Sequence, residues 1–151
     1  MLLVTAAFCP ALAKNDCAVQ AGDLQISQAY AIDDATPGRL RVYMTIYNGG
    51  FFDDYIRAAA SPLGTAELRD ERGLDHRALL DQPVMEIPLR AGQLRELKPQ
   101  GYYILLEELE ENLGIGERFS LALRFRLAGE TTMPITYLGR DPEKYRDKIC
   151  P

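Results

Sequence analysis

Histidine and tryptophan are nearly absent from this chain, because His76 is its one histidine and it has no tryptophan. A Ser-His-Asp or Cys-His catalytic arrangement would have to use His76 alone, and the sequence contains neither a GxSxG nor an HExxH motif. A single histidine between Asp75 and Arg77 is more often a solvated loop residue than a catalytic one. The sequence therefore predicts that the protein is not an enzyme.

Clusters of basic residues are also lacking. The chain has 17 lysines and arginines against 22 aspartates and glutamates, a formal net charge of −5. Without a basic patch to neutralise phosphates, binding to nucleic acid or to an anionic membrane surface is not expected. No apolar run after the first residues reaches the roughly 18 residues of a membrane-spanning helix. We expect a protein partner, no nucleic acid and no insertion into a membrane.

Residues 1–13 (MLLVTAAFCPALA) have the pattern of the last part of a signal peptide. An apolar run leads to the small-x-small cleavage pattern of Ala11-Leu12-Ala13. Cys9 follows Phe8, which is too bulky for a lipidation signal. No basic residues precede the run, so either the true start lies upstream or this is an ordinary buried N-terminal segment. The first alternative predicts a periplasmic or otherwise exported protein.

Cleavage after Ala13 would remove Cys9 and leave two cysteines, Cys17 and Cys150, one near each end of the mature chain. Two unrelated thiols are one alternative, and a metal site would need further cysteines or histidines that the ends lack. In an oxidising compartment a single Cys17–Cys150 disulfide is expected. Closing so long a loop would stabilise the fold by about 4–5 kcal/mol at most in the chain-entropy model.

Alternating apolar and polar residues predict strands along most of the chain. The clearest case is residues 40–47, where Leu40, Val42, Met44 and Ile46 occupy every second position. Residues 48–50 (NGG) then predict a turn, since asparagine and glycine tolerate positive φ. Further strands are expected over 24–26 continuing to 29–32, and over 55–59, 65–69, 78–80, 84–89, 101–106, 118–127 and 131–137. This spacing favours one all-β domain with antiparallel strands.

Two segments are expected to lie outside these strands. Leu106, Leu109 and Leu113 have helical spacing and Gly114 would act as a stop, so a short helix or a turn is predicted in that connection. Residues 139–151 are mostly polar and are expected to form a surface tail. The predicted organisation is therefore a signal peptide (1–13), one β-domain (14–138) and a C-terminal tail (139–151).

One ordered set of segments goes beyond strand and turn patterns, and it consists of residues 41–50, 58–62, 66–69, 91–92, 97–99 and 109–116. Each piece alone is compatible with ordinary strands and turns, but the ordered set covers residues 22–137. It resembles the periplasmic copper(I) chaperones of the PCuAC type, whose pattern reads roughly AYMTIxNxG, GAxSP, VELH, MxM, PAG, LxPGGxHxML and GLxxxLxxG. The resemblance implies a cupredoxin-like antiparallel β-sandwich or barrel.

The copper ligands of that family are the histidine that closes VELH, the methionines of MxM, and the histidine and methionine of HxM. The resemblance aligns these positions with Arg69, with Leu79 and Asp81, and with Tyr103 and Leu105. Cu(I) prefers thioether sulfur and neutral imidazole, whereas guanidinium has no free lone pair and phenol, carboxylate and alkyl groups are hard or inert. The resemblance therefore implies a divergent member that has lost its copper site and holds no cofactor.

Two alternatives remain for the missing ligands. Met44 is expected in the core, whereas His76 and Met85 are soft side chains that could form a weak, displaced copper site. The replaced positions suggest instead an interaction surface of Arg69, Tyr102 and Tyr103, with Arg72 and Arg77 nearby. It is equally compatible with the sequence that Arg69 pairs with a neighbouring carboxylate and that Tyr103 fills space.

The sequence thus favours an exported PCuAC-like protein that acts by protein contacts. The family resemblance implies a partner in copper trafficking or in oxidase assembly. The alternative is a working periplasmic copper(I) chaperone that uses displaced ligands or ligands supplied by a partner.

Overall fold

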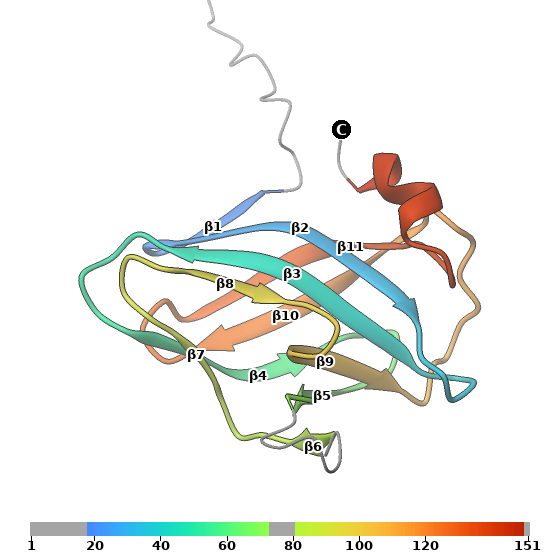
Figure 1. Cartoon of the computed structure of the whole chain (residues 1–151), viewed down its shortest axis with the longest axis horizontal. Helices are drawn as coiled ribbons and strands as arrows, with labels where there is room; N and C mark the ends of the chain where they lie inside the picture. The colour runs from blue at the N-terminus through green and yellow to red at the C-terminus, as the bar shows by residue number, and fades with distance from the viewer. Residues whose placement is uncertain (1–17, 73–80, 150–151) are drawn as a thin grey trace, which may run out of the picture.

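Strands form at most of the expected positions in the computed structural model, which describes residues 18–72 and 81–149 (Figure 1). The strands are β1 (Val19–Ala21), β2 (Leu24–Asp33), β3 (Leu40–Asn48), β4 (Asp54–Ala60), β5 (Thr65–Asp70), β6 (Gln82–Pro83), β7 (Ile87–Leu89), β8 (Leu94–Leu97), β9 (Tyr102–Glu107), β10 (Arg118–Phe125) and β11 (Glu130–Tyr137). A short 3-10 helix, η1 (Glu143–Lys148), follows the last strand.

These strands belong to one sheet that curls on itself, in the order β6-β5-β9-β3-β2-β11-β10-β4-β7 (Figure 1). β1 is paired with β2, and β8 is paired with β3 beyond the end of β9. All of these pairs are antiparallel except β11 with β2, where Thr136 lies opposite Tyr30. The predicted all-β fold with antiparallel strands is confirmed, and the parallel contact is the one exception among the described strands.

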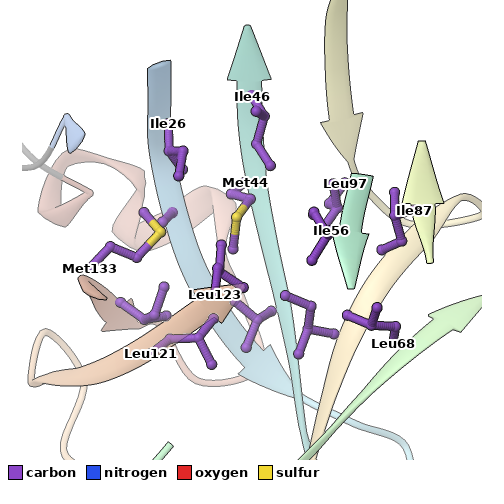
Figure 2. Close-up of a cluster of buried hydrophobic side chains, with 14 of the residues drawn as sticks. Ile26, Met44, Ile46, Ile56, Leu68, Ile87, Leu97, Leu121, Leu123 and Met133 are labelled. Carbon is purple, nitrogen blue, oxygen red and sulfur yellow. The ribbon is translucent and has the colours of Figure 1, made fainter. Parts of the chain in front are cut away.

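The inward faces of the strands form a continuous apolar core, part of which Figure 2 shows. On β3 the alternation predicted from the sequence is confirmed, because Leu40, Val42, Met44 and Ile46 are all buried. Met44 lies among aliphatic side chains, as expected of a core methionine (Figure 2). The labelled members of the cluster are Ile26, Met44, Ile46, Ile56, Leu68, Ile87, Leu97, Leu121, Leu123 and Met133.

A second, smaller cluster covers the opposite face of the sheet around β3 and β9. It consists of Tyr43, Tyr103 and Leu105, with Tyr30 and Ile32 packed against it. The ring centroids of Tyr43 and Tyr103 lie 6.4 Å apart, within the usual range for aromatic pairs. Because both faces are covered here, every residue of β9 from Tyr102 to Leu106 is buried.

Short or irregular strands were the least predictable. β1, β6 and β8 were not expected, and the strand expected over 84–89 begins only at Ile87. The strand expected over 78–80 lies outside the described residues. The segment 108–113 contains bends and no helical turn, although Leu109 and Leu113 still pack against the core.

The hairpin between β4 and β5 lies close against the end of β9. A side chain at Gly64 would collide with the backbone oxygen of Glu107, so this approach requires glycine. Thr65 then lies opposite Glu107 and the pairing of β5 with β9 continues from there. Gly64 thus allows the close approach at the start of the pairing that places the candidate site residues of the two strands opposite each other.

The C-terminal segment adds a feature that the sequence did not predict. η1 ends at Lys148 and the next residue, Ile149, is buried. The backbone N–H of Asp33 donates to the carbonyl of Gly139 at 3.0 Å, which ties the start of this segment to the end of β2. In the described part of the chain, no helix has the length and apolarity needed to span a membrane.

Candidate functional site

Three of the positions that the resemblance aligns with copper ligands lie side by side. Arg69 on β5 is directly opposite Tyr103 on β9, and it is also opposite Pro83 on β6. Asp81 immediately precedes β6 and is therefore placed beside Arg69. The sheet register, and not the spacing along the chain, brings Arg69, Asp81 and Tyr103 into one site.

The guanidinium of Arg69 is held on three sides. Its Nε donates to Oδ1 of Asp81 at 2.8 Å, its Nη2 donates to the carbonyl oxygen of Asp81 at 3.1 Å, and its Nη1 donates to Oε2 of Glu67 at 3.1 Å. Burial acts to lower the pKa of Arg69, but the hydrogen bonds to the two carboxylates outweigh it and raise the pKa above its ordinary value. Arg69 is a fixed cation with 18% of its side chain exposed.

Tyr103 lies beneath this ion pair and is fully buried. Its hydroxyl donates to Oδ2 of Asp81, so one carboxylate accepts hydrogen bonds from both Arg69 and Tyr103. Burial, together with the hydrogen bond to Asp81, raises the pKa of Tyr103 well above its usual range. The phenol is therefore held protonated and cannot act as an anionic ligand at neutral pH.

Arg41 also contacts Tyr103, although the sequence did not indicate it as a site residue. Its guanidinium carbon lies 4.4 Å from the centre of the Tyr103 ring, a cation–π distance. Its Nε donates to Oδ1 of Asp34 and its Nη1 to Oε2 of Glu71, each at 2.5 Å. Burial acts to lower the pKa of Arg41, but these hydrogen bonds raise it above its ordinary value.

We call Arg41, Arg69, Asp81, Glu71 and Tyr103 the polar network. Asp81 is also 3.8 Å from Nη2 of Arg41, so it lies between the two guanidinium groups. Glu71 accepts a further hydrogen bond from the backbone N–H of Gln100 at 2.6 Å. Each carboxylate of the network is thus engaged by an arginine and is not free to bind a cation without breaking that contact.

Tyr102 belongs to a neighbouring contact on the other face of β9. Nη2 of Arg72 donates to the Tyr102 hydroxyl at 2.6 Å, and the guanidinium carbon lies 4.1 Å from the ring centre. Arg72 also donates through Nε and Nη2 to the two carboxylate oxygens of Asp70, and these hydrogen bonds lower the pKa of Asp70. The rings of Tyr102 and Tyr103 are both buried, so of the three residues suggested as an interaction surface only Arg69 keeps an accessible side chain.

The remaining predicted positions are distributed differently. Leu105 is buried in the second cluster with Tyr43 and Tyr103. Met85 is 91% exposed on the segment between β6 and β7. Leu79, His76, Cys17 and Cys150 lie outside the described residues, as does Arg77.

The donor set does not fit a Cu(I) ion. At the aligned positions, the described side chains offer a guanidinium, a carboxylate, a protonated phenol and an isobutyl group, whereas Cu(I) favours sulfur and imidazole. In residues 18–72 and 81–149 there is also no group of three or more histidine, cysteine, aspartate or glutamate side chains arranged to hold a metal ion. What the site can do is present a rigid arrangement of opposite charges.

Comparison with solved structures supports the same architecture. The chain is 18% identical to a copper-bound PCuAC domain from PmoF2, with a TM-score of 0.67 over 81% of this chain and 97% of that domain. It is 22% identical to an apo PCuAC domain from PmoF1, with a TM-score of 0.68 over 81% of this chain and 98% of that domain. It is 20% identical to CuI-DR1885 from Deinococcus radiodurans, with a TM-score of 0.57 over 85% of this chain and 86% of that one.

At these identities the likeness establishes the fold. A search of the curated proteins finds no significant match. Residues 24–136, about three quarters of the chain, match the family model described as "Putative lipoprotein LpqE-like". The resemblance expected from the sequence is confirmed: the chain belongs to the LpqE-like family, and its fold is that of the PCuAC domains.

Proposed function

We propose that this chain is an exported protein of the PCuAC fold that acts by binding other proteins and does not hold Cu(I) at the positions of the family's ligands. The observation that carries the proposal is the bonding of Arg69, Asp81 and Tyr103 to one another at those positions. A copper ion placed there would have to displace a charge-assisted hydrogen bond and would find no soft donor in return. The role is one of binding and not of catalysis.

Export is supported by two independent observations. Residues 1–13 have the apolar run and cleavage pattern of a signal peptide. The family is described as a lipoprotein family, which also implies passage across a membrane. We infer a periplasmic or otherwise exported location, with a copper-trafficking or oxidase-assembly protein as the partner that the PCuAC likeness implies.

The recognition surface would combine the accessible part of the polar network with two neighbouring residues. Arg69 and Asp81 of the network keep part of their side chains accessible, as does Glu67, and Arg72, in the neighbouring contact with Tyr102, is half exposed. Ion pairs whose partners are already fixed lose little side-chain freedom on binding, so they favour orientation and specificity in a complex. The partner would therefore carry complementary charges and not an apolar patch at this face.

A working copper(I) chaperone is the second candidate, and one observation favours it. The thioether of Met85 is almost fully exposed, so its sulfur is available to a metal ion or to a metal held by another protein. With His76, it would make a two-ligand site that a partner completes. In this alternative the polar network takes no part in metal binding.

A Cu(I) competition titration against a chromophoric chelator separates the two candidates. The protein spanning residues 14–151 is compared with a variant carrying Arg69→His, Asp81→Met, Tyr103→His and Leu105→Met, and both are first checked for folding by circular dichroism. We expect the natural protein to leave copper on the chelator and the variant to gain at least partial binding. Stoichiometric, tight binding by the natural protein would contradict the proposal.

A second variant assigns any copper that the natural protein does bind. Replacing His76 by alanine and Met85 by serine changes no residue of the polar network. Loss of binding in this variant would identify the displaced site and establish the copper chaperone. Binding that persists in it would exclude that site and contradict both candidates in their present form.

A further inference from the structure

The most exposed aromatic side chains of the described chain occur together in the connection between β3 and β4. Phe51 is 96% exposed and Phe52 is 75% exposed. We call residues 49–53 the aromatic loop. Figure 1 shows this connection projecting at one end of the curled sheet. Large exposed apolar groups that cluster in this way usually mark a contact surface.

The loop is held in place and is not a loose tail. The side-chain amide of Asn48 is buried and donates to the carbonyls of Phe52 at 3.0 Å and Leu89 at 2.9 Å, while its oxygen accepts from the N–H of Gly50 at 3.0 Å. The N–H of Gly49 donates to the carbonyl of Asp23 at 2.9 Å. The buried side chain of Asn48 thus fixes a loop whose two phenylalanine rings are exposed to solvent.

The aromatic loop is remote from the polar network. Arg41 and Asn48 lie near opposite ends of β3. Asn48 is seven positions after Arg41, so at the rise of about 3.3 Å per residue the two lie roughly 23 Å apart along the strand. A contact made by the phenylalanines is therefore independent of the proposed function and of whether the chain binds copper.

The apolar surface continues from the loop onto the adjacent strands. Tyr47 and Leu94 are directly opposite each other on β3 and β8, and both are exposed. The ring of Tyr47 also lies beside Gly49, because a side chain at Gly49 would meet it at 3.3 Å. These residues form an apolar margin around the base of the aromatic loop.

Size and shape argue against a stable contact with a second copy of the chain. A phenylalanine buries roughly 150–250 Å², so the two rings offer roughly 300–500 Å². A stable protein–protein interface needs about 800 Å² from each partner. A short projecting loop also presents a convex tip, which a soft bilayer can accommodate without a matching pocket.

The hydrogen bonding and the charges of the loop also favour contact with a lipid surface. Its internal hydrogen bonds reduce the number of backbone groups that would lose water on entering a lipid interface. Asp23 and Asp53 border the loop, and Arg90 and Arg126 lie on neighbouring turns, so the region has no excess of positive charge. An anionic surface is not favoured, whereas a zwitterionic one is.

We propose that the aromatic loop docks this protein onto a zwitterionic lipid surface by inserting Phe51 and Phe52 into the headgroup region. The contact is interfacial and does not span the bilayer. It changes the expectation from the sequence, which was of no insertion into a membrane, at these two side chains alone. It depends on apolar insertion, so it is insensitive to salt and is not strengthened by anionic lipid. Its orientation leaves the polar network, at the other end of β3, accessible to a protein partner.

The absence of tryptophan makes a direct test possible. Phe51→Trp introduces a single tryptophan at the tip of the loop, and Met85→Trp introduces one at an equally exposed site between β6 and β7. Both are made in the chain spanning residues 14–151, because the apolar segment 1–13 would itself enter lipid. Phosphatidylcholine vesicles are added, with and without phosphatidylglycerol, and tryptophan emission and quenching by brominated lipid are measured.

We expect a blue shift and lipid quenching for Phe51→Trp and neither for Met85→Trp. In vesicle sedimentation, Phe51→Ser with Phe52→Ser should lower binding of the chain at least about tenfold, while Met85→Ser leaves it unchanged. An unshifted Phe51→Trp spectrum would overturn the proposal. A blue shift that appears without vesicles and grows with protein concentration would overturn it in favour of self-association.

Discussion

Nε of Arg69 lies 2.8 Å from Oδ1 of Asp81, so two positions that the resemblance aligns with copper ligands are held together by a charge-assisted hydrogen bond. The second oxygen of Asp81 accepts the hydroxyl of the buried Tyr103. The three side chains at these positions are therefore not independent of one another. Together they satisfy one another's polar groups in a place where single replacements would leave one unpaired.

Asp81 should therefore matter more for stability than an ordinary surface carboxylate. Asp81→Ala removes the acceptor of the buried Tyr103 hydroxyl and one partner of Arg69, and we expect it to lower the free energy of unfolding by about 1–3 kcal/mol. Urea unfolding followed by circular dichroism measures the change.

Glu67→Ala is the matched control for that variant. Glu67 also binds Arg69, at 3.1 Å, but its side chain is 43% exposed, against 32% for Asp81. Exposed ion pairs contribute about 0–1 kcal/mol, so this variant should lose clearly less stability than Asp81→Ala. Equal losses in the two variants would show that the Tyr103 hydroxyl does not depend on Asp81.

Two tyrosines, the buried Tyr43 and the half-buried Tyr137, should make the fold sensitive to high pH. Burial raises the pKa of Tyr43 to about 12, and burial together with a hydrogen bond to Asp33 raises that of Tyr137 to about 12, from 10.0 in the unfolded chain. The folded state then holds these protons more tightly than the unfolded state. This contribution to stability is fully present below pH 10 and is lost as the pH rises toward about 12.

Phenolate absorbance and unfolding curves test this in the same samples. Part of the tyrosine signal should ionise only well above pH 10 in the folded protein, and stability should fall over that interval. Tyr137→Phe should make the fall shallower, since it removes one of the late-ionising groups. The expectation is wrong if all tyrosines of the folded chain ionise together near pH 10.

The aromatic loop gives a third prediction, which concerns its anchor. Asn48→Ala leaves the buried carbonyl of Leu89 without its donor, and we expect a loss of about 1–3 kcal/mol in the free energy of unfolding. Asp53→Ala is the control, because it removes only an exposed hydrogen bond to the N–H of Ala91. Hydrogen exchange of the Gly50 amide should accelerate in the Asn48 variant, and unchanged exchange would contradict the anchoring role.

The sequence was most informative where local pattern and sheet pairing agree. On β3 every second residue is apolar, and these residues face the core as predicted. β8 was not predicted, because LREL is too short to show a period. What defines it as a strand is its pairing with residues 44–47 of β3, a long-range contact that no local pattern contains.

The candidate site shows the same limit. Arg69, Asp81 and Tyr103 were found because the resemblance aligns them with ligands, and the structure brings them together. Arg41 was missed because, in an alternating strand, an arginine at a polar position is expected to be solvated. Only the packing of β3 against β9 places it over the Tyr103 ring and between Asp34 and Glu71.

The sequence predicted the turn before the aromatic loop but not the exposure of its phenylalanines. Residues 48–50 predict a turn, and the two adjacent phenylalanines that follow have no neighbouring strand to cover them. In contrast, no pattern indicated helix η1, since residues 143–148 are polar. Its position depends on the burial of Ile149 at its end.

The last prediction concerns Cys17 and Cys150, which lie outside the described residues. If they form the expected disulfide, the bond closes a loop of nearly the whole mature chain, and reduction should lower the free energy of unfolding by up to about 4–5 kcal/mol in the chain-entropy model. Peptide mapping without reduction should recover the two cysteines in one linked fragment. The variant with both cysteines changed to serine should match the reduced protein and should not respond to reductant. Two freely titrating thiols in the oxidised, folded protein would show that the pair is unrelated, and the stability of the fold would then have to come from the core alone.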